Sequence, residues 1–431
     1  MTVEATILIP ESIKENIFTY RFKNFLKVCG RPYSGTRAQL IERIENNLNE
    51  VNFRNKFIDF IIEELSNGKN RQMFLSRFEI VNLAVLNNLM SVQSNLAAAG
   101  LPFENFNNFL SDKIDDKEMI YLNIEKEEYE HDPSIDKVKK IEMCFYKEIV
   151  PSEELVNIDK FTDFVWVEIH PPEQLILFKI RPHNQQYLTN YYTSKKTYEE
   201  IFTILKEVFP LKIINMEYAK GVFFTIFKEL TEIAEQPYRE KIAAQNDLIN
   251  NFQAEILPLI GINDPEIIKD VSIRYKRLLE RNLIVNDIDN YLSYHNNRKG
   301  IVDRISLTDL SGASANVLSG DSDGLDVADI YFDIRETIEG MKKLDKLWVK
   351  WFLFERAVQE TQIELFEGED LEGNFQASSI QEDERTFQTR FEVTKEYIII
   401  NFVKRHWVSK EVQNHVLSTF IEFEEKTSQQ S

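Results

Sequence analysis

Residues 14–48 contain two short runs of apolar residues at helical spacing, with a break rich in glycine and proline between them. The apolar positions are Phe22, Phe25, Leu26 and Cys29 in the first run, and Leu40, Ile41, Ile44 and Leu48 in the second. Residues three and four positions apart share one face of a helix, so each run predicts a short amphipathic helix. Because residues 30–36 turn the chain, we expect a helical hairpin around one small core.

The second helix has a start signal at Thr36. Gln39 follows three residues later, which is the spacing of a capping box. The first N–H groups of a helix have no partner within it, and the helix dipole is positive at that end, so a helix N-terminus binds anions. Gly35 allows close approach to the backbone, and Arg37 adds positive charge. We therefore predict that Gly35, Thr36 and Arg37 contact a phosphate group.

Positive charge is concentrated in the same segment. From Lys14 to Arg43 there are seven basic and two acidic residues, a net charge of +5, whereas the whole chain carries −20. A basic island on an acidic protein is suited to a few phosphate contacts. The residues expected to support the phosphate site with their charges are Lys23, Lys27, Arg31 and Arg43.

Residues 34–44, SGTRAQLIERI, follow the pattern of the SAP family, in which Ser-Gly-Thr-Lys precedes an Ala/Glu-Leu-Ile-x-Arg-Ile/Leu helix. The segment therefore resembles this family of small helix-turn-helix-like DNA-binding modules. One departure is Arg31, where the family usually has an apolar residue after glycine. The resemblance implies contact with duplex DNA. Phosphate contacts position a protein without reading sequence, so we expect weak selectivity, with the family's preference for A·T-rich duplex.

Length and composition predict a globular, multidomain, intracellular protein. A chain of 431 residues exceeds one core of ordinary size, and a hydrophobic content of 43% excludes wholesale disorder. The sequence begins without a basic, apolar leader and has no run of about 18 apolar residues, so we expect a cytoplasmic protein with no membrane partner.

The only cysteines of the sequence, Cys29 and Cys144, imply no disulfide framework. The abundance of Asn, Lys, Ile and Glu is typical of an A·T-rich bacterial genome or its phages.

The pattern along the chain predicts an α+β fold with mixed antiparallel sheet and helices. The expected parts are a SAP-like module at 1–52, a helical spacer and acidic connector at 53–150 with one strand at 140–149, an α+β domain at 151–296, and a β-rich domain at 297–431. Within the third part, the aromatic and β-branched segments DFVWVEIH and EQLILFKIR flank Pro171-Pro172, which favours an antiparallel hairpin.

The last part contains several segments with strand-like composition. The expected strands are 301–308, 328–334, 347–356, 362–366, 387–391 and 397–402, with a helix at 335–344. The segment 311–326, SGASANVLSGDSDGLD, reads as a loop.

The spacing of titratable residues points to no metal site and no cofactor. The six histidines show no HxxxH or HExxH spacing, neither cysteine has a CxxC partner, and no GxxxxGK or GxSxG motif occurs. Phosphate-binding and nucleophile-elbow motifs are therefore both missing from the sequence. On this basis the protein is expected to be non-catalytic.

The nearest approach to a nuclease site lies in the predicted hairpin at 162–183. A metal-dependent nuclease commonly holds magnesium with two carboxylates while a lysine steadies the attacking water. Asp163, Glu168, His170 and Lys179 supply these residue types. The offset of five residues sends Asp163 and Glu168 to opposite faces of a regular strand, so a shared metal would need a bulge.

These observations lead to a leading hypothesis and two alternatives. The first is a DNA-tethering or sensing subunit of a larger bacterial assembly, in defence against foreign DNA, with protein partners bound by the acidic α+β body. One alternative is a metal-dependent enzyme acting on DNA with its site in the 162–183 hairpin. The other is a protein-interaction scaffold in which residues 14–48 are a docking element. The sequence identifies neither the partner proteins nor the oligomeric state.

Overall fold

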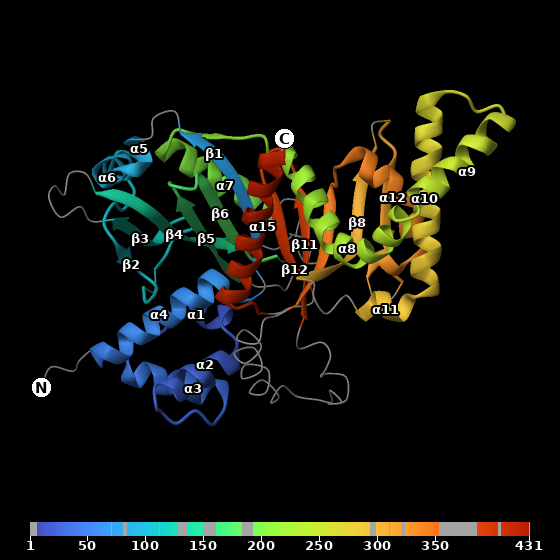
Figure 1. Ribbon diagram of the computed structural model, residues 1–431. Helices are drawn as coiled ribbons and strands as arrows, with labels where there is room; N and C mark the ends of the chain where they lie inside the picture. The colour runs from blue at the N-terminus through green and yellow to red at the C-terminus, as the bar shows by residue number, and fades with distance from the viewer. Residues whose placement is uncertain are drawn as a thin grey trace, which may run out of the picture. The chain divides into compact units, whose positions relative to one another are not determined.

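The computed structural model covers most of the chain (Figure 1). It describes residues 7–430 apart from residues 70, 81–83, 112, 128–135, 150–160, 183–192, 294–298, 310, 321–323, 353–385 and 404–406. The chain forms two compact units, and some elements contribute to both. The first unit comprises Met1–Glu217, Phe354–Glu384 and Glu392–Thr419; the second comprises Tyr218–Leu353, Arg385–Phe391 and Phe420–Ser431.

Four helices begin the first unit (Figure 1, blue). They are α1 (Glu11–Asn16), α2 (Thr19–Val28), α3 (Arg37–Asn47) and α4 (Val51–Asn67). The two helices predicted within residues 14–48 are α2 and α3, and their apolar faces are buried as expected, with Phe22, Leu40 and Ile44 fully inaccessible to solvent. We did not predict the short α1, which packs beside them.

A set of antiparallel strands forms the centre of the first unit. Their hydrogen-bonded order is β2-β3-β4-β5-β6-β1-β12, and β7 pairs with β1. The strands are β1 (Gln72–Ile80), β2 (Phe106–Asn107), β3 (Met119–Glu127), β4 (Lys137–Ile149), β5 (Phe161–His170), β6 (Leu175–Ile180), β7 (Leu211–Ile213) and β12 (Ile398–Val403). The expected hairpin at 162–183 is confirmed by the pairing of β5 with β6.

Both faces of this sheet are covered, and β5 shows how. Side chains alternate along a strand, so Val165 and Val167 enter one core, which also contains Tyr198 and Leu205 of α7 (Ser194–Val208). Phe164 and Trp166 enter the opposite core, together with apolar residues of α1, α2, α3 and α4. The N-terminal helices therefore share a core with the sheet of the first unit.

Short helices and one long helix complete the first unit. They are α5 (Ala84–Asn87), α6 (Leu89–Ala98), the 3-10 helix η3 (Met216–Tyr218) and α15 (Lys410–Gln430), and η3 and α15 continue into the second unit. No helix within the described residues is long and apolar enough to cross a membrane.

The second unit combines helices with a smaller set of strands. Its helices are α8 (Ala219–Ala243), α9 (Asn246–Leu259), α10 (Pro265–Asn286), α11 (Ile288–Ser293), η5 (Leu325–Val327) and α12 (Asp329–Met341). Its strands follow the order β11-β10-β8-β9, with bounds β8 (Gly300–Thr308), β9 (Ser314–Leu318), β10 (Lys346–Phe352) and β11 (Thr386–Val393). The protein is thus an α+β protein with antiparallel strands, as predicted.

Several predicted elements differ from the observed ones. Residues 53–150, expected as a helical spacer and connector, contain β1 and β3 as well as the anticipated strand β4. In β1, Met73, Phe74 and Leu75 are all buried because both faces of the sheet are covered, and such a continuous apolar run does not distinguish a strand from a buried helix. The predicted strand at 362–366 lies outside the described residues.

Further differences lie near the C-terminal end of the sequence. The predicted strand at 328–334 is wrong, because these residues begin helix α12. Its buried positions Tyr331, Arg335 and Ile338 have helical spacing, which becomes visible only over a longer window. Strand β9 lies within the expected loop, and helix α15 was not anticipated. The predicted strands at 301–308, 387–391 and 397–402 are confirmed as β8, β11 and β12.

Candidate nucleic-acid interface

The loop between α2 and α3 is held in a defined conformation by its own residues. Gly30 ends α2 with φ +67° and Gly35 has φ +125°, a region of backbone space that favours glycine. A side chain at position 35 would also bring a Cβ within 2.6 Å of Gln39 Oε1. Two of the three glycine and proline positions in this loop therefore have a direct conformational role.

The predicted capping box is present at the start of α3. The Thr36 N–H donates to Gln39 Oε1 at 2.9 Å, and the Gln39 N–H donates to Thr36 Oγ1 at 3.4 Å. The next N–H groups, those of Arg37 and Ala38, have no acceptor within the described part of the chain. Two backbone donors thus remain at the exposed, positive end of this helix of 11 residues.

Arg37 does not extend from this site towards solvent. Its guanidinium donates to Thr19 Oγ1 at 3.0 Å, to the Ile17 carbonyl at 3.1 Å and to the Lys14 carbonyl. It also lies 5.2 Å from the ring centroid of Phe22. Partial burial lowers the pKa of Arg37. The Ile17 carbonyl lies just beyond the end of α1, and the Lys14 carbonyl accepts from the Ile17 N–H as well as from Arg37. Arg37 therefore binds the C-terminal end of α1, where carbonyls lack the usual helical partners.

Two further predicted arginines also have partners within the module. Arg43 Nη1 donates to the carbonyls of Pro32 at 2.8 Å and Ser34 at 2.7 Å, which fixes the loop to α3. Arg31 Nη2 donates to both carboxylate oxygens of Glu50, at 2.9 and 2.6 Å. Arg43 therefore shapes the loop, whereas Arg31 is paired with an exposed carboxylate outside it. The net charge available to a ligand is smaller than the sequence suggests.

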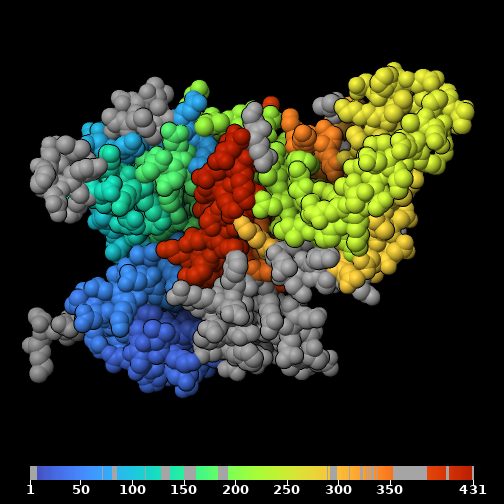
Figure 2. Space-filling model, in the orientation of Figure 1, coloured from blue at the N-terminus to red at the C-terminus, as the bar shows by residue number. Residues whose placement is uncertain are grey.

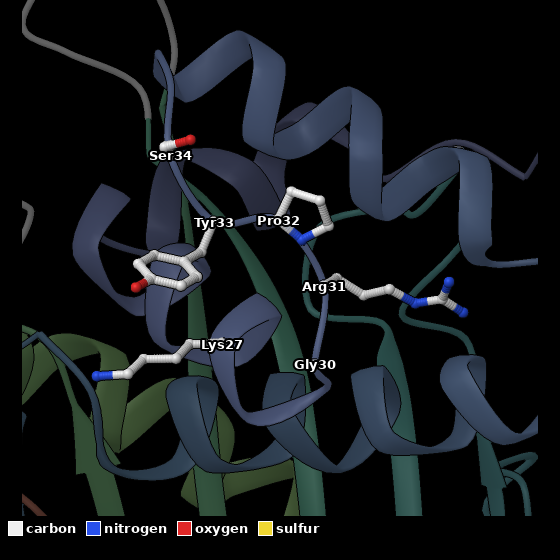
Figure 3. Close-up of a pocket in the computed structure, with 6 residues that line it drawn as sticks. All are labelled: Lys27, Gly30, Arg31, Pro32, Tyr33 and Ser34. Atoms are coloured by element: carbon white, nitrogen blue, oxygen red, sulfur yellow. The ribbon is translucent and has the colours of Figure 1, made fainter.

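A surface pocket of about 570 Å³ lies beside the loop. It is lined by Lys27, Gly30, Arg31, Pro32, Tyr33 and Ser34 (Figure 3). Lys27 and the Tyr33 ring extend to the same side, whereas Arg31 extends to the opposite side (Figure 3). The Lys27 Nζ lies 6.0 Å from the Tyr33 ring centroid. Tyr33 was not predicted as a site residue, although an exposed aromatic side chain in a basic loop is a signal for it.

The structure places Gly35, Thr36 and the pocket residue Lys27 in this exposed region, while Lys23 is half-buried on α2.

We expect Arg37→Ala to lower the free energy of unfolding by about 2 kcal/mol, because buried carbonyls lose a charged donor. Urea denaturation measures this loss. The surface substitution Lys195→Ala, at a side chain that is 63% exposed, should have no comparable effect. Equal stabilities of the two variants would contradict the assigned role of Arg37.

The residues of the alternative nuclease site form a buried ion cluster around Glu168. Its carboxylate lies 2.8 Å from Lys179 Nζ, 3.1 Å from Lys140 Nζ and 3.4 Å from His170 Nε2. Burial raises the pKa of Glu168, but the two lysines and His170 outweigh burial and hold it well below its ordinary value. Burial is the main cause that lowers the pKa of Lys179, whose Nζ also donates to Asn67 Oδ1 at 3.0 Å.

Asp163 contacts a main-chain N–H and an arginine. Its Oδ1 accepts from the Phe164 N–H at 2.7 Å and lies 3.8 Å from Arg71 Nη2. Every second residue of a regular strand points to the same face. Val165, two residues after Asp163, belongs to one core, whereas Trp166, two residues before Glu168, belongs to the other. Within the described residues, no group of three or more His, Cys, Asp or Glu side chains is arranged to hold a metal ion.

The exposed groups described above that can bind a ligand thus lie at the α2–α3 loop. They are the two backbone donors of α3, the Thr36 hydroxyl, and the pocket with Lys27 and Tyr33. Together they can bind a phosphate group and stack or pack against a neighbouring apolar group. Comparison with known protein-family models and with curated proteins found no match for this sequence.

Proposed function

We propose that the protein binds duplex DNA through the α2–α3 loop and acts as a non-catalytic tethering or sensing subunit. The observation that carries this proposal is the exposed N-terminus of α3, where the N–H groups of Arg37 and Ala38 lie beside the Thr36 cap. Such N–H groups donate to a phosphate oxygen without side-chain rearrangement. The resemblance of residues 34–44 to SAP modules favours DNA as the source of that phosphate.

The surroundings of α3 support a small electrostatic contact. Lys27 lies on the exposed side of the loop next to Tyr33, and the module carries net positive charge on a chain of −20. Arg37 and Arg43 support the proposal indirectly, since they hold the loop and helix start in place. We therefore expect few phosphate contacts, weak sequence selectivity and a shallow dependence on salt.

Fluorescence anisotropy of labelled duplex DNA across a salt series tests the proposal. We expect the double variant Lys27→Ala, Arg31→Ala to bind at least about tenfold more weakly, with a log–log salt slope that is smaller by about one to two units. These substitutions avoid Arg37 and Arg43, whose loss would disturb the loop itself. Replacing Arg31 by alanine should change the stability little, because its ion-pair partner Glu50 is exposed.

The matched control is Lys195→Ala, Lys212→Ala, which removes the same charge from exposed, ion-paired lysines elsewhere in the first unit. An equal loss of affinity in the control would mean that net charge, not the loop, determines binding. If the wild-type protein has no affinity for duplex DNA at low salt, the proposal fails. A protein-docking role for residues 14–48 would then be the interpretation to pursue, by capture of protein partners.

The roles that follow from DNA binding are part of the same proposal. The α+β body would contact protein partners within a bacterial assembly that acts in defence against foreign DNA. The alternative of a metal-dependent nuclease has less support, because the carboxylate of Glu168 is already held by Lys140 and Lys179. Assay of plasmid cleavage with magnesium tests this alternative directly.

A further inference from the structure

Helices α9 and α10 of the second unit form a helical hairpin (Figure 1, yellow). The connection contains Gly261, with φ +83°, and Asp264, which caps α10 by accepting from the Glu266 N–H at 2.8 Å. Phe252 of α9 stacks on Tyr275 of α10 with ring centroids 6.0 Å apart. This contact covers part of the Phe252 ring and leaves the residue 48% exposed.

A second apolar side of α9 is open to solvent. The packed residues Ile249, Gln253 and Leu257 recur every fourth position and are buried. Three exposed apolar residues lie one position before these, and two more follow at the C-terminal end of the helix. Their exposed fractions are Leu248 67%, Phe252 48%, Ile256 37%, Leu259 84% and Ile260 64%. We call these five side chains the α9 stripe. The surface of α9 lies in the yellow part of the space-filling view (Figure 2).

The α9 stripe is large for a surface that remains in water. Five side chains of this size and exposure present on the order of 600 Å², which is the upper end for the largest apolar patch on a typical monomer. Exposed apolar patches of this size mark interaction sites. A standard interface uses about 800 Å² from each partner, so the stripe with its flanking residues is sufficient for one.

The distribution of charge favours a second copy of the same chain as the partner. Two chains of −20 repel each other over most of their surfaces. Helix α9 has only two charged residues, Asp247 and Glu255, and α10 has five basic and three acidic residues. Helix α9 carries a net charge of −2 and α10 of +2, so the hairpin as a whole is close to neutral. Two copies therefore meet there at low electrostatic cost.

The stripe is also complementary to itself in a two-fold arrangement. If two α9 helices pack antiparallel about a point between Phe252 and Ile256, Phe252 of each copy faces Ile256 of the other. Leu248 of each copy then faces Leu259 and Ile260 of the other. Such an isologous contact uses one surface twice and closes as a dimer.

We propose that the α9 stripe is the interface of a homodimer. The inference does not depend on DNA binding, because it rests on residues of the second unit alone. Sedimentation or light scattering of the full chain over a range of concentrations tests it. We expect the wild-type protein to have twice the chain mass of 50.8 kDa at high concentration. The variant Phe252→Glu, Leu259→Glu should have the mass of a single chain at the same concentrations.

The control is Met90→Glu, at a side chain on α6 that is 64% exposed, which adds an acidic group outside the stripe and should leave the dimer intact. Circular dichroism shows whether each variant is folded. A wild-type chain that stays monomeric at every concentration overturns the proposal. So does a dimer that persists in the folded stripe variant, because another surface must then hold the two copies together.

Discussion

Replacing Arg335 by methionine is expected to lower the free energy of unfolding of the second unit by about 3 kcal/mol, because two buried carboxylates lose a paired cation. Arg335 on α12 donates to Glu235 of α8 at 2.8 Å and to Glu280 of α10 at 3.1 Å. A third bond joins it to Glu339 at 2.8 Å. Arg239 also contacts Glu235 and Glu280, so one cation remains in the variant.

Denaturant titration of wild type, Arg335→Met, Glu235→Gln and the double variant measures this coupling. The double variant should recover part of the loss, since the buried charge is then absent as well. Exchange of the exposed Arg274, which pairs with Asp270, is the control and should change stability little. A loss in Arg335→Met no larger than in the control would show that the cluster does not join α8, α10 and α12.

The same cluster predicts a dependence of stability on pH. Burial raises the pKa of Glu235 to about 7, although Arg335 and Arg239 act in the opposite direction. When the pKa of a carboxyl is higher in the folded state than in the unfolded state, the group stabilises the folded protein at pH values below its unfolded-state pKa. This stabilisation is lost as the pH rises through the folded-state pKa. Glu235→Gln should therefore reduce the decline in stability between about pH 4.5 and 7. An unchanged pH profile would contradict this expectation.

Replacing Lys179 by methionine is expected to lower the free energy of unfolding of the first unit by about 3 kcal/mol. The substitution leaves Glu168 buried with Lys140 as its remaining close lysine, and it leaves Asn67 without the Lys179 donor. Because the folded pKa of Glu168 is lowered, its stabilising contribution is present above the unfolded pKa and is lost as pH falls. The difference between wild type and variant should therefore shrink in acid.

Urea titration at neutral and acidic pH measures the Lys179 effect, and the double variant Glu168→Gln, Lys179→Met provides the comparison. A pair that acts structurally should show strong coupling between the two substitutions. A pair that acts in nuclease chemistry should instead leave stability nearly unchanged and abolish magnesium-dependent plasmid cleavage. The same two variants therefore separate the structural role of the cluster from the alternative nuclease.

The elements that were predicted well depend on neighbours close in sequence. The capping box of Thr36 and Gln39 spans three residues, and the hairpin of β5 and β6 spans a short turn. The apolar spacing of α2 and α3 likewise repeats within a few residues. Local backbone hydrogen bonding and side-chain periodicity decide such features, and both are visible in the order of the amino acids.

The prediction that failed at residues 328–334 shows the opposite case. The segment ADIYFDI has strand-like composition, but Tyr331 and Arg335 face Glu235 from one side of α12. Strands β1 and β3, within 53–150, were missed for a related reason. β1 pairs with β6 and β12, so its neighbours lie about 100 and more than 300 residues further along the chain.

By itself, the sequence determined the helical hairpin of residues 14–48, its capped start at Thr36 and the antiparallel pairing of β5 with β6. Only the tertiary structure decided which charges remain available. It directs Arg37 to the carbonyls at the end of α1, buries Glu168 between Lys140 and Lys179, and leaves the α9 stripe uncovered. The physical reason is that helix periods and caps arise from adjacent residues, whereas burial and ion pairing depend on groups that only folding brings together.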